Sequence, residues 1–234
     1  KRPALGGLFA PLWGAIYARR AERFCEAKSS EYTSRSGPPE AARPSVLPLR
    51  AGNQPTQRGM SMGSYAIMRC KKLSSMGSVA SSLKHAYRER ETPNADSSRT
   101  PDNEHRAAST TDEAMGKLRE LLPEKRRKDA VLAVEYVLTA SPEWWKQASQ
   151  ADQVKFFDQA QRWLAEKYGA DRIITASIHR DETSPHMTAF VVPLTQDGRL
   201  SAKEFIGNKA QMTRDQTTFA ASVADLGLQR GIEG

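Results

Sequence analysis

The chain has 234 residues, of which 38% are hydrophobic, and this predicts a globular domain with one sizeable core and polar appendages. No apolar run approaches the roughly 20 residues that span a bilayer, which argues against a membrane role. Two isolated cysteines, Cys25 and Cys70, give neither a disulfide framework nor a zinc-finger spacing, so we expect a cytoplasmic protein.

The formal net charge of +8 suggests a polyanionic partner, but the charge is unevenly distributed. Residues 1–59 hold ten Lys or Arg and four Asp or Glu, which leaves a net charge of only +2 on residues 60–234. Local clusters of cations can still follow a phosphate backbone. The run Lys125 to Lys128 is equally typical of a solvated surface. The stronger candidates for DNA binding are Arg69, Lys71, Lys72, Lys84, Arg88 and Arg90.

Residues 1–61 mix Gly, Pro, Ser and Arg with short apolar patches, and they predict a disordered leader or extension. A folded domain is expected from residue 62 to residue 234. Its first elements are a strand over 64–72 and a helix over 76–90 with one apolar face. His85 lies at the edge of that face, where a lone histidine is more often a partly exposed surface residue than a catalyst.

Residues 91–110 are rich in Pro, Asn, Asp, Ser and Thr and predict a long loop. A loop of this length inside a domain is often functional. His105, which lies in it, either contacts substrate or is solvated. Thr110 and Glu113 then have the spacing of a capping box, which predicts a helix that runs to Leu122.

The run 129–140 is β-rich and can bury both faces, so it predicts a central strand. Its single charge, Glu135, needs a partner if it is buried. Helical patterning follows over 142–168, with a break near 149–152 that splits it into two helices.

The segment 173–192, IITASIHRDETSPHMTAFVV, predicts a β-hairpin because two β-rich runs flank a polar turn. Symmetric pairing places His179 opposite His186, so both imidazoles point to the same face. The loop between them carries Asp181 and Glu182. The next pairs are Ser177 with Thr188 and Thr175 with Phe190, and the opposite, apolar face would consist of Ile174, Ala176, Ile178, Met187, Ala189 and Val191.

Downstream of the hairpin, Asp197 and Gly198 predict a turn into a short strand. The last predicted element is a helix over 208–226.

Two imidazoles beside two carboxylates fit a divalent-metal site of nitrogen and oxygen ligands. The same arrangement is typical of surface histidines next to a turn, and spacing alone does not decide between them. Asp181 has three interpretations: a group that orients a histidine, a turn residue, or the carboxylate ligand in place of Glu182. Two imidazole ligands favour Mn²⁺, with Mg²⁺ as the alternative, because Mg²⁺ prefers oxygen and keeps its waters.

The stretch HRDETSPHM resembles the metal-binding motif of the MobV (Mob/Pre) family of plasmid mobilisation relaxases, which runs roughly HxDExTPHMH. Ser184 replaces a threonine of the pattern, and Thr188 replaces its last histidine. The resemblance covers roughly residues 62–234 in the order strand, LKH helix, central strand, helix, hairpin and GRLSAKEF. The matching residues of the motif are His179, Asp181, Glu182, Pro185, His186 and Met187.

This resemblance implies an α+β fold, the HUH-type relaxase palm, with an antiparallel sheet and helices packed on one side. Pattern analysis alone reaches only a mixed α+β domain. The resemblance also implies that His179, Glu182 and His186 bind the metal, and that His85 of the LKH helix is the nucleophile. The implied partner is plasmid origin-of-transfer DNA, single-stranded or supercoiled. We expect the natural C-terminal region, implicated in homodimerisation, to be absent.

The implied reaction is metal-dependent, strand-specific nicking and strand transfer through a covalent 5′-phosphate–histidine intermediate. His85 suits this role because a neutral imidazole, with a reference pKa of about 6.5, has a free lone pair at neutral pH. Tyr87, with a reference pKa of about 10, would first need a base. The alternatives are a non-catalytic origin- or operator-binding protein and a hydrolytic metal-dependent nuclease.

Overall fold

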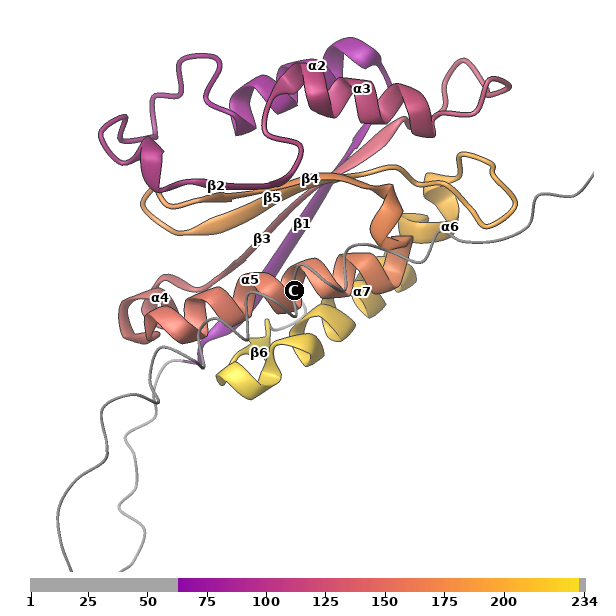
Figure 1. The fold of residues 1–234 in the computed structure, drawn as a ribbon. Helices are drawn as coiled ribbons and strands as arrows, with labels where there is room; N and C mark the ends of the chain where they lie inside the picture. The colour runs from indigo at the N-terminus through magenta and orange to yellow at the C-terminus, as the bar shows by residue number, and fades with distance from the viewer. Residues whose placement is uncertain (1–62, 232–234) are drawn as a thin grey trace, which may run out of the picture. The chain divides into compact units, whose positions relative to one another are not determined.

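The computed structural model describes residues 63–231, so the prediction for residues 1–61 lies outside the described residues. Within this part of the chain, a six-stranded sheet has the order β2-β4-β5-β3-β1-β6 (Figure 1). All neighbouring strands are antiparallel except β1 and β6. The strands are β1 (Tyr65–Leu73), β2 (Glu104–Ala107), β3 (Ala133–Ala140), β4 (Ile173–His179), β5 (His186–Val191) and β6 (Gln229–Arg230).

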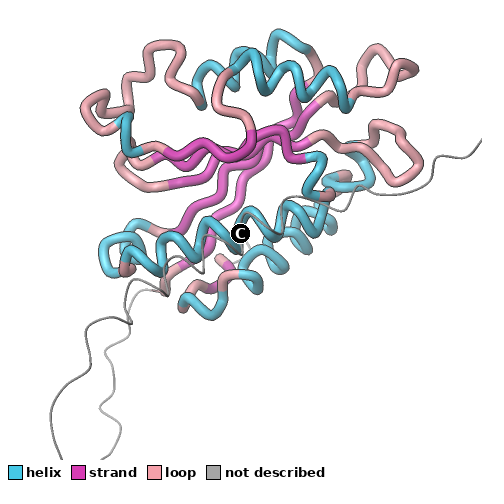
Figure 2. Tube along the Cα trace, in the orientation of Figure 1, coloured by secondary structure: helices cyan, strands magenta, loops and turns pink. Residues whose placement is uncertain are grey.

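Helices lie on both sides of this sheet. The two helices α2 and α3 lie along one side, and α4, α5 and α7 lie along the other (Figures 1 and 2). The mixed α+β class is confirmed, whereas the expected packing on one side is corrected. The helices are α2 (Met76–Ala86), α3 (Thr111–Leu121), α4 (Pro142–Gln147), α5 (Gln150–Tyr168), α6 (Ala202–Ile206) and α7 (Lys209–Ser222), and short 3₁₀ turns cover Thr100–Asp102, Ala170–Arg172 and Ala224–Leu226.

Two separate apolar clusters explain why helices are needed on both sides. The larger cluster packs α4, α5 and α7 against the sheet and includes Tyr136, Phe156 and Phe219. The smaller cluster packs α2 and α3 against the other face and includes Leu83 and Phe190. All of strand β4 is buried, so its two faces each require a covering layer.

The hairpin pairs as its symmetry predicts. His179 lies opposite His186, with the Ser177–Thr188 and Thr175–Phe190 pairs following it. A register shift between Ile173 and Thr175 interrupts the alternation of side chains. As a result Ile173 joins the larger cluster and Ile174 the smaller one, so the predicted face of Ile174 is wrong.

The predicted N-cap of α3 and the predicted break between α4 and α5 are confirmed. The Thr110 side chain accepts a hydrogen bond from the Glu113 backbone N–H at 3.2 Å and begins α3. The predicted break divides α4 from α5, and the Ser149 side chain caps α5 by accepting from the Asp152 N–H at 3.1 Å. Gly169 ends α5 at a φ of 98°, which disfavours a side chain.

Two predicted segments differ from the structure. The segment predicted as a loop, 91–110, contains strand β2, which pairs with β4. After the turn at Gly198 there is an isolated bridge between Leu194 and Leu200 and then helix α6, in place of the predicted strand. None of the helices in residues 63–231 combines the length and apolar character that crossing a membrane requires.

Removing a side chain from the smaller cluster tests whether α2 is part of a true second core. Leu83 is fully buried there, so Leu83→Ala should lower the free energy of unfolding by about 2–5 kcal/mol through lost burial and a residual cavity. Val154 on α5 is 44% exposed, and Val154→Ala should change it by less than about 0.5 kcal/mol. Urea unfolding of both variants measures the difference, and equal losses would contradict the two-core description.

Candidate active site

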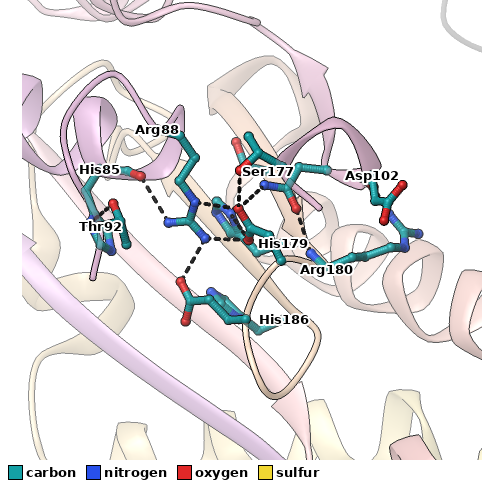
Figure 3. Close-up of polar contacts among 12 residues, drawn as sticks. His85, Arg88, Thr92, Asp102, Ser177, His179, Arg180 and His186 are labelled. Atoms are coloured by element: carbon teal, nitrogen blue, oxygen red, sulfur yellow. Dashed lines mark hydrogen bonds and ion pairs between the residues drawn. The ribbon is translucent and has the colours of Figure 1, made fainter. Parts of the chain in front are cut away.

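The two hairpin histidines stack against each other at the ends of β4 and β5. Their ring centroids are 4.9 Å apart, and the ring planes are inclined by 28° (Figure 3). His179 is almost completely buried, whereas His186 is half-buried. The pair therefore has one ring fixed in the sheet and one ring nearer the surface.

The nitrogens of the two rings are suited to bind a cation. His186 Nδ1 lies 3.1 Å from the Ser184 carbonyl oxygen, which can only accept, so Nδ1 carries the proton and Nε2 keeps its lone pair. His179 Nδ1 is buried and has no hydrogen-bond partner. Burial, followed by the nearby His186 and Arg88, lowers the pKa of His179 to about 2. A neutral ring with an unsatisfied buried nitrogen fits a metal ligand.

The structure does not bring Glu182 to this pair as a third ligand. Glu182 Oε1 instead accepts a hydrogen bond from Arg88 Nη2 at 2.8 Å. Across residues 63–231, no three His, Cys, Asp or Glu side chains lie together in a way that could hold a metal ion. Thr188, which replaces the last histidine of the family pattern, is buried opposite Ser177, in the pair next to the histidines.

Asp181 is a buried structural acceptor. Its carboxylate receives four hydrogen bonds: from Arg88 Nε at 2.9 Å and Nη2 at 2.7 Å, from Asn103 at 2.8 Å and from Thr100 at 3.2 Å. Burial acts to raise the pKa of this carboxyl, but the bonds from Arg88 and Asn103 prevail and hold the pKa well below its ordinary value. Its oxygens are therefore already engaged, which disfavours the interpretation as a metal ligand.

Arg88 is not available to contact DNA, contrary to our prediction. Its side chain is only 8% exposed and forms ion pairs with Asp181 and Glu182. The same guanidinium donates from Nη1 to the His85 carbonyl oxygen at 3.2 Å. The sequence shows that Arg88 is charged but not that it forms ion pairs, because its two acidic partners lie more than 90 positions further along the chain.

His85 lies in the last turn of α2, and Figure 3 shows it next to Thr92, to the left of Arg88. It is half-buried, and its Nδ1 is 3.4 Å from Thr92 Oγ1. Burial, followed by the positive charges of Arg88 and Arg90, lowers the pKa of His85 below 6.5. The ring is therefore neutral at neutral pH and keeps a lone pair for nucleophilic attack.

Tyr87, the alternative nucleophile, is packed into the smaller core. Its hydroxyl donates to the Ala108 carbonyl oxygen at 3.0 Å, and the side chain is 9% exposed. Burial raises the pKa of Tyr87 to about 12. Each of these features makes a tyrosinate nucleophile unfavourable.

His105 is not a solvated loop residue. It lies on β2, where its Nδ1 is 2.9 Å from Ser177 Oγ. Its ring packs in a T-shaped arrangement with that of Tyr87, with the ring centroids 5.0 Å apart. The strand has the sequence EHRA, which contains none of the residues that favour strands, such as Val, Ile, Thr, Phe, Tyr or Trp. The sequence therefore carried no strand signal that could have found it.

A cavity of about 480 Å³ opens beside His186. It contains residues that the sequence analysis did not single out, among them Asn94 and Thr183. Strand β3 contributes Val137 and Thr139 to its lining, and both are half-buried. The lining residues are Asn94, Val137, Thr139, Glu182, Thr183, Ser184 and His186.

The candidate DNA-binding cations do not all share a face. Arg69 pairs with Val137, which pairs with Thr188, so Arg69 lies on the histidine face of the sheet. Lys71 is two residues further and shares that face, whereas Lys72 lies on the opposite one. Lys84 and Arg90 are exposed on and just after α2.

Comparison with known proteins identifies the family. A family model described as plasmid recombination enzyme (Mob_Pre) matches residues 62–234. The chain belongs to this family. A 65 kDa protein of Zymomonas mobilis is 35% identical over 179 residues, which are 74% of this chain and 31% of that protein.

The Mob_Pre resemblance extends to curated enzymes and to solved structures. A plasmid recombination enzyme type 3 of Staphylococcus aureus is 33% identical, over 72% of this chain and 43% of that enzyme. This chain thus spans less than half the length of these relatives. The Mn-bound MobM relaxase domain, in complex with plasmid pMV158 oriT DNA, is 29% identical with a TM-score of 0.63. The match covers 72% of this chain and 90% of that domain, which confirms the relaxase fold.

The two neighbouring acids should differ sharply in their effect on stability. Asp181→Asn places an amide against donors that need a carboxylate and leaves Arg88 poorly paired, so it should cost about 3–5 kcal/mol of unfolding free energy. Glu182 is partly exposed, and Glu182→Gln should cost less than about 1 kcal/mol. Urea unfolding at pH 7 in the presence of a chelator measures both. Equal costs would contradict the structural role given to Asp181.

Proposed function

We propose that this chain is the catalytic domain of a DNA relaxase that nicks one strand at a plasmid origin of transfer and can rejoin it. The observation that supports this most directly is the placement of a neutral imidazole, His85, on a helix end that Arg88 ties to the tip of the histidine hairpin. Membership of the Mob_Pre family and similarity to a relaxase domain bound to oriT DNA support it as well.

The proposed cofactor is a divalent cation held by His179 and His186. The orphaned Nδ1 of His179 and the free Nε2 of His186 fit such an ion, and Mn²⁺ is favoured because the MobM domain is Mn-bound. Mg²⁺ is the alternative. Glu182 would complete the set through Oε2, because its Oε1 accepts a hydrogen bond from Arg88. When bound, the ion supplies positive charge that stabilises the phosphate oxygens during displacement.

In the proposed reaction, His85 attacks the phosphorus of the scissile phosphodiester. Nδ1 faces Thr92, which leaves Nε2 as the attacking nitrogen. A nitrogen–phosphorus bond forms, the bond from phosphorus to the 3′ oxygen breaks, and the 3′ oxygen leaves and takes a proton from solvent. The resulting phosphoramidate on the 5′ end keeps the energy of the broken bond, so attack by a 3′ hydroxyl can reseal the strand.

The proposed partner is origin-of-transfer DNA, and the open part of the histidine face is its proposed path. Arg69 and Lys71 are exposed on that face. Arg69 lies opposite the half-buried Val137 that lines the cavity beside His186, and Lys71 lies opposite Glu135, with its ammonium 3.9 Å from that carboxylate. Cations on a rigid strand can follow a phosphate backbone without further ordering.

The nucleophile is tested by trapping the covalent adduct on an origin oligonucleotide with saturating Mn²⁺. His85→Ala should abolish the adduct, and Tyr87→Phe should retain it. Because the pKa of His85 lies below 6.5, the rate should rise with pH up to that pKa and be flat between about pH 7 and 9. A tyrosine nucleophile would instead give a rate that rises towards about pH 12. Cleavage without a protein-linked 5′ end would indicate a hydrolytic nuclease, and binding without cleavage a non-catalytic DNA-binding protein.

The path of the DNA is tested with two neighbouring lysines that face opposite sides of one strand. Lys71→Ala should weaken oligonucleotide binding by roughly threefold to tenfold at low salt and reduce the salt dependence by about one ion. Lys72→Ala makes the same change in net charge on the other face and should leave affinity within about twofold. Fluorescence anisotropy across salt concentrations measures both, and equal losses would place the DNA elsewhere.

A further inference from the structure

Arg88 lies at an unusual position in the backbone, immediately after the C-cap of α2. Its φ of 57° is in the left-handed region, which non-glycine residues rarely adopt. Its backbone N–H donates to the His85 carbonyl oxygen at 3.2 Å. The backbone N–H of Glu89 donates to the Lys84 carbonyl oxygen at 2.9 Å. The chain therefore turns sharply at Arg88, and this turn directs its side chain away from the helix and into the site.

The buried guanidinium joins the end of α2 to the tip of the histidine hairpin. It makes four side-chain hydrogen bonds: one to the His85 carbonyl oxygen, two to Asp181 and one to Glu182. A guanidinium presents donors in a rigid planar fork, so the bidentate contact to Asp181 fixes orientation as well as distance.

Asp181 extends this connection to a third segment. Its carboxylate also accepts from Thr100 and Asn103, and its backbone oxygen accepts from the Asp96 N–H at 2.8 Å. Asn103 in turn accepts from the Arg180 N–H at 2.7 Å. The end of α2, the segment 96–103 and the hairpin tip are thus held together around one carboxylate with no exposed surface.

We propose that Arg88 is a positioning residue for strand transfer, which holds His85 in place relative to His179 and His186 through the carboxylate of Asp181. This inference rests on the proposed function. A nucleophile displaced by about 1 Å can lose about 100-fold in rate. Arg88 acts in this way without touching DNA, because its donors are directed at protein oxygens and its side chain is buried.

The decisive measurement is single-turnover adduct formation on an origin oligonucleotide with saturating Mn²⁺, at increasing protein concentration. It separates the maximal rate from the apparent dissociation constant for DNA. Arg88→Lys keeps the charge but replaces the fork with a single ammonium group. The maximal rate should fall by about 100-fold, while the dissociation constant should remain within about twofold of wild type.

The control variant breaks a comparable ion pair on the other side of the sheet. Lys167 on α5 pairs with Asp215 on α7 at 2.7 Å, and both side chains are largely buried. Lys167→Gln should lower the melting temperature as Arg88→Lys does but leave the maximal rate within about twofold. In ¹H–¹⁵N spectra, the His85 ring resonances should shift in Arg88→Lys and stay unchanged in Lys167→Gln.

A milder variant keeps the test decisive should Arg88→Lys not fold. Thr100→Val removes one hydrogen bond to Asp181 and leaves a side chain of the same shape. It should lower the maximal rate severalfold without changing DNA affinity. An unchanged maximal rate in a folded Thr100→Val variant would count against the proposal.

The other outcomes separate the possible failures. Weaker DNA binding with an unchanged maximal rate in Arg88→Lys would make Arg88 a DNA contact. An equal fall in the maximal rate in Lys167→Gln would show that the effect of Arg88→Lys comes from a general loss of stability and not from the position of His85. Absence of any adduct with the wild-type chain would overturn the relaxase function itself, and the positioning role with it.

Discussion

A carboxylate that is shielded from water needs hydrogen-bond donors on all sides, and at Asp181 this requirement organises the site. Its donors come from the end of α2 and from the segment that contains Thr100 and Asn103. Both segments lie roughly 80 to 90 positions before Asp181 in the chain. The pairing of Asp181 with Arg88 therefore determines where His85, three residues before Arg88, lies relative to the hairpin.

The sheet provides a site that is rigid and yet open, because only part of its histidine face is covered. Towards one end, α2 and α3 pack on Leu73 and Phe190. Near the histidines the same face presents the half-buried Val137 and the exposed Arg69. A surface built on central strands with a second core behind it can bind a chain of phosphates without ordering a loop first. The two-sided packing, which the sequence analysis missed, thus contributes directly to function.

The histidine pair could be predicted from sequence because it depends on short-range rules. Two β-rich runs around a polar turn pair symmetrically, and a period of two then places His179 beside His186. The same rule failed at Ile174, since a bulge that no residue type announces reverses the alternation there. It could not place Arg88 either, because a buried ion pair and an exposed phosphate contact look identical in a sequence. Both show only a basic residue near the end of the predicted helix.

The two acids next to each other in the hairpin tip show why a motif match does not assign a role to each residue. Asp181 and Glu182 bind the same guanidinium, but the side chain of Asp181 has no exposed surface while that of Glu182 is 22% exposed. If Asp181 moved, the side chains of Arg88, Thr100 and Asn103 would lose their shared hydrogen-bond acceptor. Glu182, in contrast, can turn towards solvent or a cation at a small cost in free energy. The chain has Thr188 in place of the last histidine of the family pattern, so the proposed metal site would have one imidazole fewer and would gain more from an oxygen ligand. Of the two carboxylates, only Glu182 is free enough to supply one while the framework around His85 stays intact.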